Sequence, residues 1–439
     1  MIIASGSFAS VVKSSTVISS TKGAFITENN RFKLQSLLLT ATAFILGFSE
    51  FNIIGVLNDI AHQFHVSVSS VGYLVTIFAL VYAISTPIFT TLIEQHRLLP
   101  VLLSLMGIFT LGNLITVCAP TYAVLTLSRI MIALVSGVAI SITMTFAIKL
   151  APKDRRAWLI AWVYSGFSIA AVLGMPIGTW VSEHWGWRMS FLVITLLSVV
   201  LLIMLASFLP RQLRQSQEQK VSLGSQLIIF KDWRILLGVL VVIFNFTGIY
   251  VVYTYLRPIF VSGMGIATTL ITPLFMAYGF MTLGSNQFSG RLAAHSGLTK
   301  MPRVYGVLAI ALACLPLGLQ LTWVGLLIVF IMGFSMYLIN SPIQLHFLGI
   351  TEKDYPQSMV LAASLHSIFC NVGIATGSAI GGLLVAHGGL NSIGPGGAIF
   401  ILVTLGLVVS LNHLNQHWDQ HPHTTLSADD HVRGETSHQ

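Results

Sequence analysis

The chain has 439 residues and a formal net charge of +8, and 55% of its residues are hydrophobic while only 8% are charged. A soluble domain carries roughly 25% charged residues, so this composition excludes an ordinary soluble protein. It also excludes a nucleic-acid-binding protein, because the basic residues form short clusters between apolar runs and no continuous stripe. A transmembrane helix needs only about 20 apolar residues, and the chain is therefore long enough to cross a membrane about twelve times.

Residues 1–32 are rich in Ser and Thr and lack the layout of a cleavable signal peptide, so we expect a disordered cytoplasmic tail. Long apolar runs then alternate with short polar segments as far as residue 209. Each run is long enough to cross the hydrocarbon core as a helix, so residues 33–209 should form a half of six helices. The expected spans are approximately 34–57, 68–92, 98–118, 123–149, 158–181 and 189–209.

A polar segment at residues 210–232 follows this half. It begins with Pro210 and is rich in Arg and Gln, which cannot enter hydrocarbon, so we interpret it as a cytoplasmic central loop. Residues 233–413 should form a second half of six helices, and residues 414–439 a polar, His-rich cytoplasmic tail. The expected spans of the second half are approximately 233–256, 266–292, 301–320, 322–347, 357–386 and 395–413. We therefore predict an all-α membrane protein with twelve transmembrane helices in two six-helix halves.

The distribution of Lys and Arg predicts the orientation in the membrane, since basic loops are retained on the cytoplasmic side. With the N-terminus inside, nearly all of the 22 Lys and Arg residues fall in cytoplasmic segments. Arg188 and Arg257 are left on the outer side, close to span ends, and Arg129 lies within a span. We therefore expect a multi-pass protein of the plasma (inner) membrane with both termini in the cytoplasm.

Glu50 is the acidic residue that falls well inside an expected span, and Arg129 is its basic counterpart. Counting from the span ends puts both roughly 10 Å inside the outer membrane boundary, at a rise of about 1.5 Å per residue. A charge at such depth costs at least about 2.5 kcal/mol, so each side chain should face water or a partner. Two interpretations stay open: Glu50 binds and releases a proton under the influence of Arg129, or the two residues form a static ion pair.

Several amides and a histidine within the expected spans could line a polar path for a substrate, because a desolvated polar group needs a hydrogen-bond partner. Each of them could instead join two helices. They are Asn52, Asn245, Asn340, Gln344, His366 and Asn371. The sequence contains no nucleophile elbow, metalloprotease helix or phosphate-binding glycine loop, so we expect neither an enzyme nor a metal site or a cofactor.

The fifth expected span of each half is rich in small residues. Glycines let helix backbones approach closely, and a proline at membrane depth is tolerated where neighbouring groups satisfy the freed carbonyl. Six-span repeats of this kind are typical of transporters, in which one half moves against the other around a central site. The residues are Gly166, Gly174, Pro176 and Gly178 in the first half and Gly373 and Gly377 in the second.

Several segments carry recognisable motifs. Gly166–Gly178 is followed by Gly-Trp-Arg at 186–188, Arg129–Gly137 opens with the embedded arginine, and Glu50–Ala61 opens with the embedded acid. Together with Ala362–Gly377 in the eleventh span, these segments resemble the major facilitator superfamily. The likeness is closest to its twelve-span drug:proton antiporter branch, which includes bacterial sugar-efflux and arabinose-efflux permeases.

The loop after the second span departs from the pattern of that family. The family has an Asp-Arg pair followed by a basic cluster there, whereas this chain has Glu94 and Arg97. The resemblance implies that these two residues are left to form the salt-bridge latch attributed to this loop.

The resemblance implies a monomeric secondary active transporter that exports a small molecule, a sugar or a drug-like compound, in exchange for protons. It assigns proton coupling to Glu50 and Arg129. A facilitator or a proton symporter for uptake is an alternative, and a membrane-embedded enzyme or sensor is a more remote one. The expected partners are thus a small-molecule substrate, protons and the lipid bilayer.

Overall fold

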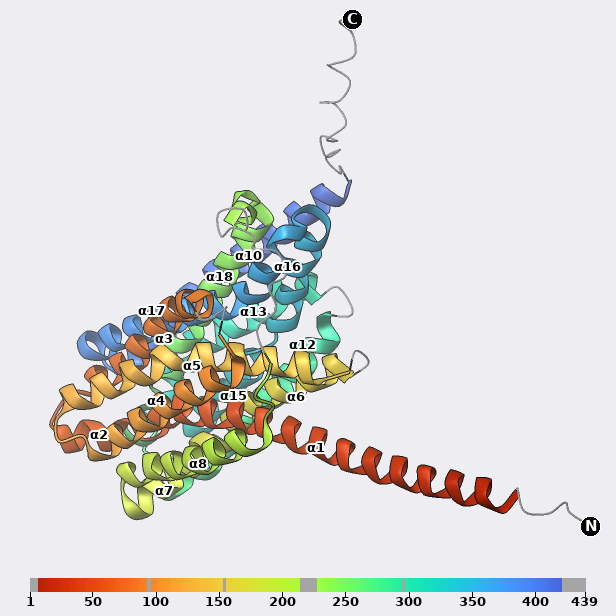
Figure 1. Cartoon of the computed structure of the whole chain (residues 1–439). Helices are drawn as coiled ribbons and strands as arrows, with labels where there is room; N and C mark the ends of the chain where they lie inside the picture. Colours follow the sequence, from red (N-terminus) through yellow and green to blue (C-terminus); the bar gives the residue numbers. More distant parts are fainter. Residues whose placement is uncertain (1–6, 93–95, 153–154, 214–226, 294–296, 421–439) are drawn as a thin grey trace, which may run out of the picture.

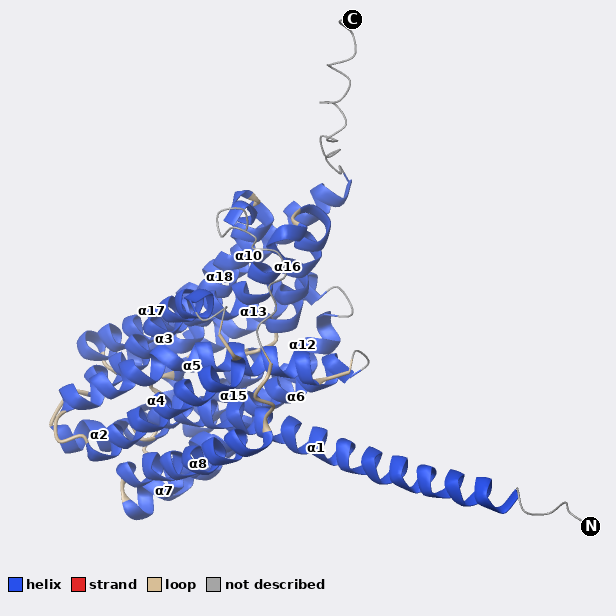
Figure 2. Ribbon diagram, viewed as in Figure 1, coloured by secondary structure: helices blue, strands red, loops and turns tan. Residues whose placement is uncertain are grey.

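The computed structural model describes residues 7–92, 96–152, 155–213, 227–293 and 297–420, and the regular structure in these ranges is helical, without strands (Figure 2). In the first half the helices are α1 (Ser7–Gly55), α2 (Leu57–Phe64), α3 (Val68–Leu92), α4 (Leu98–Cys118), α5 (Tyr122–Leu150), α6 (Arg156–Ile169), a π-helical turn (Ala170–Gly174), α7 (Met175–Trp185) and α8 (Trp187–Phe208). In the second half they are α10 (Trp233–Tyr253), α11 (Leu256–Pro258), α12 (Ile271–Ala293), α13 (Gly297–Ala313), α14 (Leu315–Gln320), α15 (Thr322–Ser335), α16 (Asn340–Asp354), α17 (Met359–Gly388) and α18 (Ile393–Gln420).

Every expected span overlaps one of these helices or a run of consecutive ones. Within the described ranges, ten segments are long and apolar enough to cross a membrane by length and composition. The other two expected spans correspond to α12 and to α13 with α14. Polar residues near the end of α12, including Asn286 and Gln287, lower its hydropathy, and the break after Ala313 leaves α13 with only 17 residues.

The first helix is longer than the first expected span. We expected residues 1–32 to form a disordered tail, but α1 begins at Ser7 and projects away from the bundle as a single helix (Figure 1). The first proline of the chain is Pro87, so no residue before the span removes a helical hydrogen bond. The Ser/Thr-rich composition, which suggested a disordered tail, does not by itself end a helix.

The fifth span of the first half changes its helical geometry at its centre. The π-helical turn Ala170–Gly174 lies between α6 and α7, and Pro176 follows it at the start of α7. Proline has no N–H to donate, so the preceding turn must adjust, and a wider turn is one way to do so. In the second half, by contrast, α17 is continuous from Met359 to Gly388.

In both halves the fifth span packs closely on the first. A Cβ atom added to Gly166 would collide with the backbone oxygen of Thr40 in α1, and one added to Gly174 would lie 2.9 Å from the Phe48 ring. The second half repeats this contact: a Cβ added to Gly373 would lie 2.6 Å from the backbone oxygen of Ile243 in α10. These glycines therefore let two helix backbones come into direct contact in each half.

The two halves meet along two pairs of helices. One pair is α3 and α17 (Figure 1). The other is α12 with the π-helical turn and α7. At the second contact, a Cβ added to Gly279 would lie 2.6 Å from the Cα atom of Val172, so the backbones again touch. Below, the end of the bundle at which α1 finishes and α18 begins is called the distal end.

The Gly377 contact provides a test of this packing. A Cβ at Gly377 would collide with the backbone oxygen of Thr247. We expect Gly377→Val to destabilise the protein by about 1–3 kcal/mol, because neither backbone can move away without disturbing the bundle. The measurement is thermal unfolding in detergent. Gly406→Val is the matched control, since no atom lies within 4 Å of a Cβ added there; equal Tm values for the two variants would contradict the packing.

Candidate functional site

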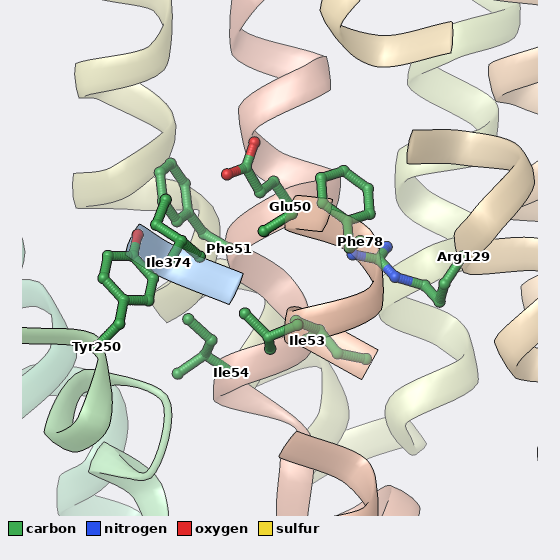
Figure 3. A pocket seen from close by; sticks show the side chains of 10 residues that line it. Glu50, Phe51, Ile53, Ile54, Phe78, Arg129, Tyr250 and Ile374 are labelled. Carbon is green, nitrogen blue, oxygen red and sulfur yellow. The ribbon is translucent and has the colours of Figure 1, made fainter. Parts of the chain in front are cut away.

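A small cavity lies between the two halves, and Glu50 and Arg129 both line it (Figure 3). The space in which the centre of a water molecule can lie is about 10 Å³. A space of this size holds about one water molecule. In this conformation it does not accommodate a substrate. Helices α1, α3 and α5 contribute to it from the first half, and α10 and α17 from the second. The lining residues are Glu50, Phe51, Ile53, Ile54, Val75, Phe78, Ala79, Arg129, Tyr250 and Ile374.

The Glu50 carboxyl group enters this cavity from α1, five residues before the helix ends at Gly55. Among the described residues it has no hydrogen-bond partner and no ion-pair partner, and Figure 3 shows the carboxyl group pointing away from Arg129. Apolar and aromatic side chains make up most of the wall around it. The carboxyl group therefore lies in a mostly apolar cavity and is not held by a polar partner from the described residues.

Arg129 is almost completely buried, with 1% of its surface exposed. Its Nη1 atom donates to the backbone oxygen of Ser49 at 3.1 Å and to the Ser49 hydroxyl at 3.4 Å, and the guanidinium lies 4.7 Å from the centre of the Phe78 ring. The Nε atom has no acceptor. The static ion pair between Glu50 and Arg129, one of the two interpretations left open above, is thus not present in this structure.

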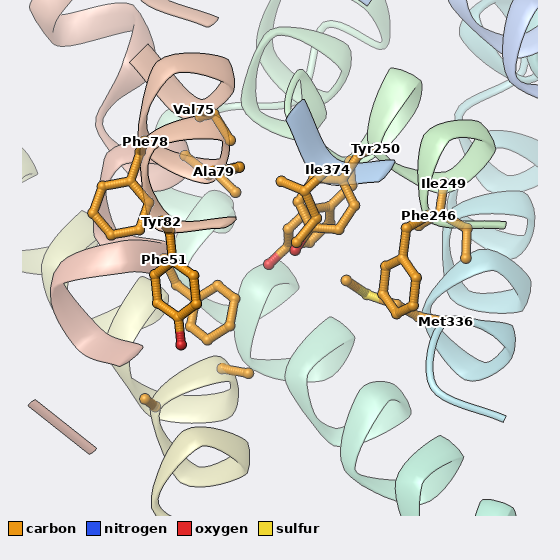
Figure 4. Close-up of a cluster of buried hydrophobic side chains, with 14 of the residues drawn as sticks. Phe51, Val75, Phe78, Ala79, Tyr82, Phe246, Ile249, Tyr250, Met336 and Ile374 are labelled. Carbon is orange, nitrogen blue, oxygen red and sulfur yellow. The ribbon is translucent and has the colours of Figure 1, made fainter. Parts of the chain in front are cut away.

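Aromatic side chains from both halves surround the cavity (Figure 4). The rings of Tyr250 and Tyr253 are 5.0 Å apart, and the Tyr253 ring stacks on the Tyr278 ring at 5.5 Å. The Tyr278 hydroxyl donates to the sulfur of Met336 at 3.5 Å. The second half thus presents a wall of flat, polarisable aromatic rings opposite Phe51 and Phe78 from the first half.

The expected polar path is only partly assembled. His366 and Asn340 lie together, with the ring Nε2 and the amide Oδ1 at 3.2 Å, and the Phe246 ring packs against His366. Asn371 donates to the backbone oxygen of Ser367 in its own helix. Gln344, on α16, is half-buried and has a polar partner.

Asn52 and Asn245 lie elsewhere in the packed bundle, away from the cavity lining. Asn52 is fully buried and donates to the Ser190 hydroxyl at 2.8 Å, and a Cβ added to Gly178 would collide with its Oδ1 atom. Asn245 is enclosed in α10, and neither polar atom of its side chain has a partner. Asn52 therefore joins two helices, α1 and α8, and does not line the cavity.

The Gly-Trp-Arg motif at 186–188 ties the start of α8 to the end of α4. Gly186 has a φ of 88°, a backbone conformation that favours glycine, and it separates α7 from α8. Arg188 then donates to the backbone oxygens of Val117 and Ala119 at 3.1 and 2.6 Å. A cation at the C-terminal end of a helix satisfies carbonyl groups that have no partner within it.

The two residues of the loop after α3 are only partly described. Arg97 is exposed and immediately precedes α4. Glu94 lies outside the described residues, so the contact expected of these two residues stays a prediction.

An ion pair joins the two halves at the distal end, and it was not expected from the sequence. Arg257 of α11 donates from both terminal nitrogens to the two carboxylate oxygens of Asp59 in α2, at 2.9 and 3.0 Å. It also donates to the backbone oxygen of Gly55, and the Ser182 hydroxyl donates to Asp59 at 2.6 Å. The sequence did contain a signal for this pair. Asp59 and Arg257 each follow the first expected span of their own half, and both fall on the expected outer side.

Comparison with known proteins places this geometry in a family. The Major Facilitator Superfamily profile matches residues 39–355. The uncharacterized MFS-type transporters YfhI and YtbD of Bacillus subtilis (strain 168) are 30% and 28% identical to this chain, and the matches cover 89% and 83% of the chain and 96% and 92% of those relatives.

Solved structures share the fold at low sequence identity. A D-xylose-proton symporter has a TM-score of 0.67 at 16% identity, with 85% of this chain and 96% of that chain covered. The nucleoside transporter NupG has a TM-score of 0.68 at 11% identity, with 88% and 98% covered. Because the family profile matches well over half of the sequence, this chain belongs to the Major Facilitator Superfamily and is an integral membrane transporter of a small solute.

Proposed function

We propose that this transporter exports a small molecule, a sugar or a drug-like compound, in exchange for protons, and that Glu50 is the residue that carries the proton. The observation that supports the proposal most directly is the position of Glu50, in a cavity to which both halves contribute. A group between two halves that move against each other can be exposed to one side of the membrane and then to the other. A proton bound there can therefore be carried across.

The surroundings of Glu50 favour such a role. Burial in an apolar wall opposes the ionised form of a carboxyl group, and a guanidinium nearby favours it. Arg129 cannot itself give up a proton in a protein, so the titrating group of the pair must be Glu50. A movement that alters the distance between the two groups would thus change how tightly Glu50 holds a proton.

The orientation of the transporter is part of the proposal. The positive-inside distribution of Lys and Arg assigns the distal end to the outer side and both termini to the cytoplasm, in the plasma (inner) membrane. The pair of Asp59 and Arg257 would then hold the outer ends of the two halves together. The conformation described here would be closed towards the outside.

The fifth span supports the proposed direction of transport. Its small residues resemble the antiporter signature of exporters, and its last turns reach the distal ion pair through Ser182. The symporter among the solved structures has the same fold, so the fold alone does not set the direction. Uptake by symport or facilitated diffusion is the alternative, and substrate counterflow that needs no Glu50 and no proton gradient would favour it.

Glu50→Gln tests the proton site. In proteoliposomes with an acidic interior, we expect uptake of either radiolabelled L-arabinose, as a sugar, or ethidium, as a drug-like compound, because protons leaving through an exchanger draw substrate inward. The Gln side chain cannot ionise. We therefore expect flux driven by the proton gradient to fall to the level of protein-free liposomes, while exchange of substrate at equal pH continues.

Glu352→Gln is the matched control, because Glu352 is an exposed residue of α16 and does not line the cavity. It should retain gradient-driven flux. If Glu50→Gln also retained it, Glu50 would no longer be the coupling residue.

Whether the distal ion pair holds the outer side closed is tested by measuring how fast a reagent added outside reaches the cavity. Ile54 is 2% exposed and lines the cavity, so in a cysteine-free background Ile54→Cys should react slowly with a membrane-impermeant maleimide added outside. Hydrogen bonds to charged groups are worth about 1.5–3 kcal/mol, so Asp59→Asn or Arg257→Gln should speed labelling roughly tenfold or more.

His184→Gln is the control for this experiment. His184 is exposed near the distal end and contacts the backbone oxygen of Trp180 in its own helix, so its replacement should not open the bundle. Equally slow labelling of Ile54→Cys alone and of Ile54→Cys combined with Asp59→Asn, Arg257→Gln or His184→Gln would show that the ion pair does not hold the outer side closed.

A further inference from the structure

A chain of hydrogen bonds links three helices behind Arg129. Arg129 of α5 donates to the Ser49 hydroxyl of α1 at 3.4 Å, and that hydroxyl donates to Oδ1 of Asn113 in α4 at 2.9 Å. The Asn113 amide nitrogen in turn donates to the backbone oxygen of Phe109 at 2.9 Å. Ser49 and Asn113 are both completely buried, so neither can replace these partners with bulk water.

Asn113 determines which groups donate and which accept along this series of hydrogen bonds. Its amide nitrogen faces a carbonyl oxygen, which can only accept, so its Oδ1 atom must face Ser49. A serine hydroxyl has one proton, and Asn113 receives it. The lone pairs of the Ser49 oxygen are therefore left for Arg129, and donors aligned in one direction strengthen one another.

The consequence concerns the residue that follows Ser49. With the Arg129 guanidinium held on Ser49, its charge is beside α1 but is not paired with Glu50. If this hold were released, the guanidinium would be free to turn towards the carboxyl group one residue further along the helix. An opposite charge at about 4–6 Å favours the ionised carboxylate.

We propose that Asn113 is a positioning residue for proton coupling: through Ser49 it keeps Arg129 away from Glu50 and so allows Glu50 to bind a proton. This rests on the proposed role of Glu50 and adds to it a residue that touches neither the proton nor the substrate. No family motif quoted above includes Asn113.

The other ionisable groups around Glu50 do not compete with this effect. Phenols and thiols are uncharged at neutral pH, so Arg129 is the charged neighbour. The groups that face Glu50 are Arg129 of α5, Tyr82 of α3, Tyr250 and Tyr253 of α10, Tyr337 between α15 and α16, and Cys370 of α17.

The test measures the protonation of Glu50 itself, without any substrate. The protein is reconstituted in lipid, and the carbonyl stretch of the protonated carboxyl group is followed by infrared difference spectroscopy against pH, with Glu50→Gln used to assign the band. We expect Asn113→Leu, which keeps the branched skeleton of the side chain but loses the acceptor, to lower the midpoint by about one pH unit or more. Ser49→Ala should shift it in the same direction, since it removes the hydroxyl link but keeps the backbone oxygen.

Thr116→Val is the matched control. Thr116 lies one turn after Asn113 on α4, is fully buried, and shares a 2.8 Å hydrogen bond with Ser128 of α5. Its loss removes a bond between α4 and α5 without touching Ser49, so the midpoint should stay at the wild-type value. A cooperative thermal unfolding transition establishes that each variant is folded. If Asn113→Leu does not fold, the midpoint of Ser49→Ala alone tests the proposal.

The two proposals fail in different ways. If Glu50 shows no titration in the wild-type protein, the proposed proton site is wrong. If it titrates, but Asn113→Leu and Ser49→Ala leave the midpoint unchanged, raise it, or shift it no more than Thr116→Val does, then Asn113 does not position Arg129 for coupling.

Discussion

Arg129 carries a permanent positive charge in the interior of the helical bundle, and no carboxylate of the described residues neutralises it in this conformation. An unpaired charge at this depth is costly, so the surroundings must offset it. They do so with the backbone oxygen of Ser49, a hydroxyl that is itself polarised by Asn113, and the face of the Phe78 ring. The need to accommodate this charge explains why three helices meet there through polar side chains rather than through apolar contacts.

The bundle around this charge is held by close backbone contacts. Without a hydrophobic driving force between helices in lipid, small residues that allow dense packing must provide the attraction. Gly174 and Gly373 place the fifth helix of each half directly against the first. The first helix of the first half is also the one that carries Glu50. Its position therefore depends on the glycines of the fifth span, which gives the antiporter-like segment a physical connection to the proposed proton site.

The sequence was sufficient to place the spans and the two embedded charges, because hydrocarbon requires long apolar runs and makes any exception conspicuous. It was not sufficient to orient the side chains. Whether Arg129 turns to Glu50 or to Ser49 depends on Asn113, which belongs to another helix, and Asn52 faces a helix contact because of the rotation of α1 about its axis. The pair of Asp59 and Arg257 is separated by 198 positions, so spacing along the chain could not reveal it.

The two ends of this system are joined by one short stretch of helix. Glu50 lies five residues before Gly55, or about 7.5 Å along the axis of α1, and the Gly55 oxygen accepts a hydrogen bond from Arg257 of the second half. A helix is rigid over such a length, so the contact between the halves at the distal end and the carboxyl group in the cavity cannot move independently. If the second half withdraws Arg257, the restraint on the end of α1 is released together with that on Asp59. Opening of the distal end and a change in the surroundings of Glu50 would then be two aspects of one movement, which is the requirement for exchanging a proton against a substrate.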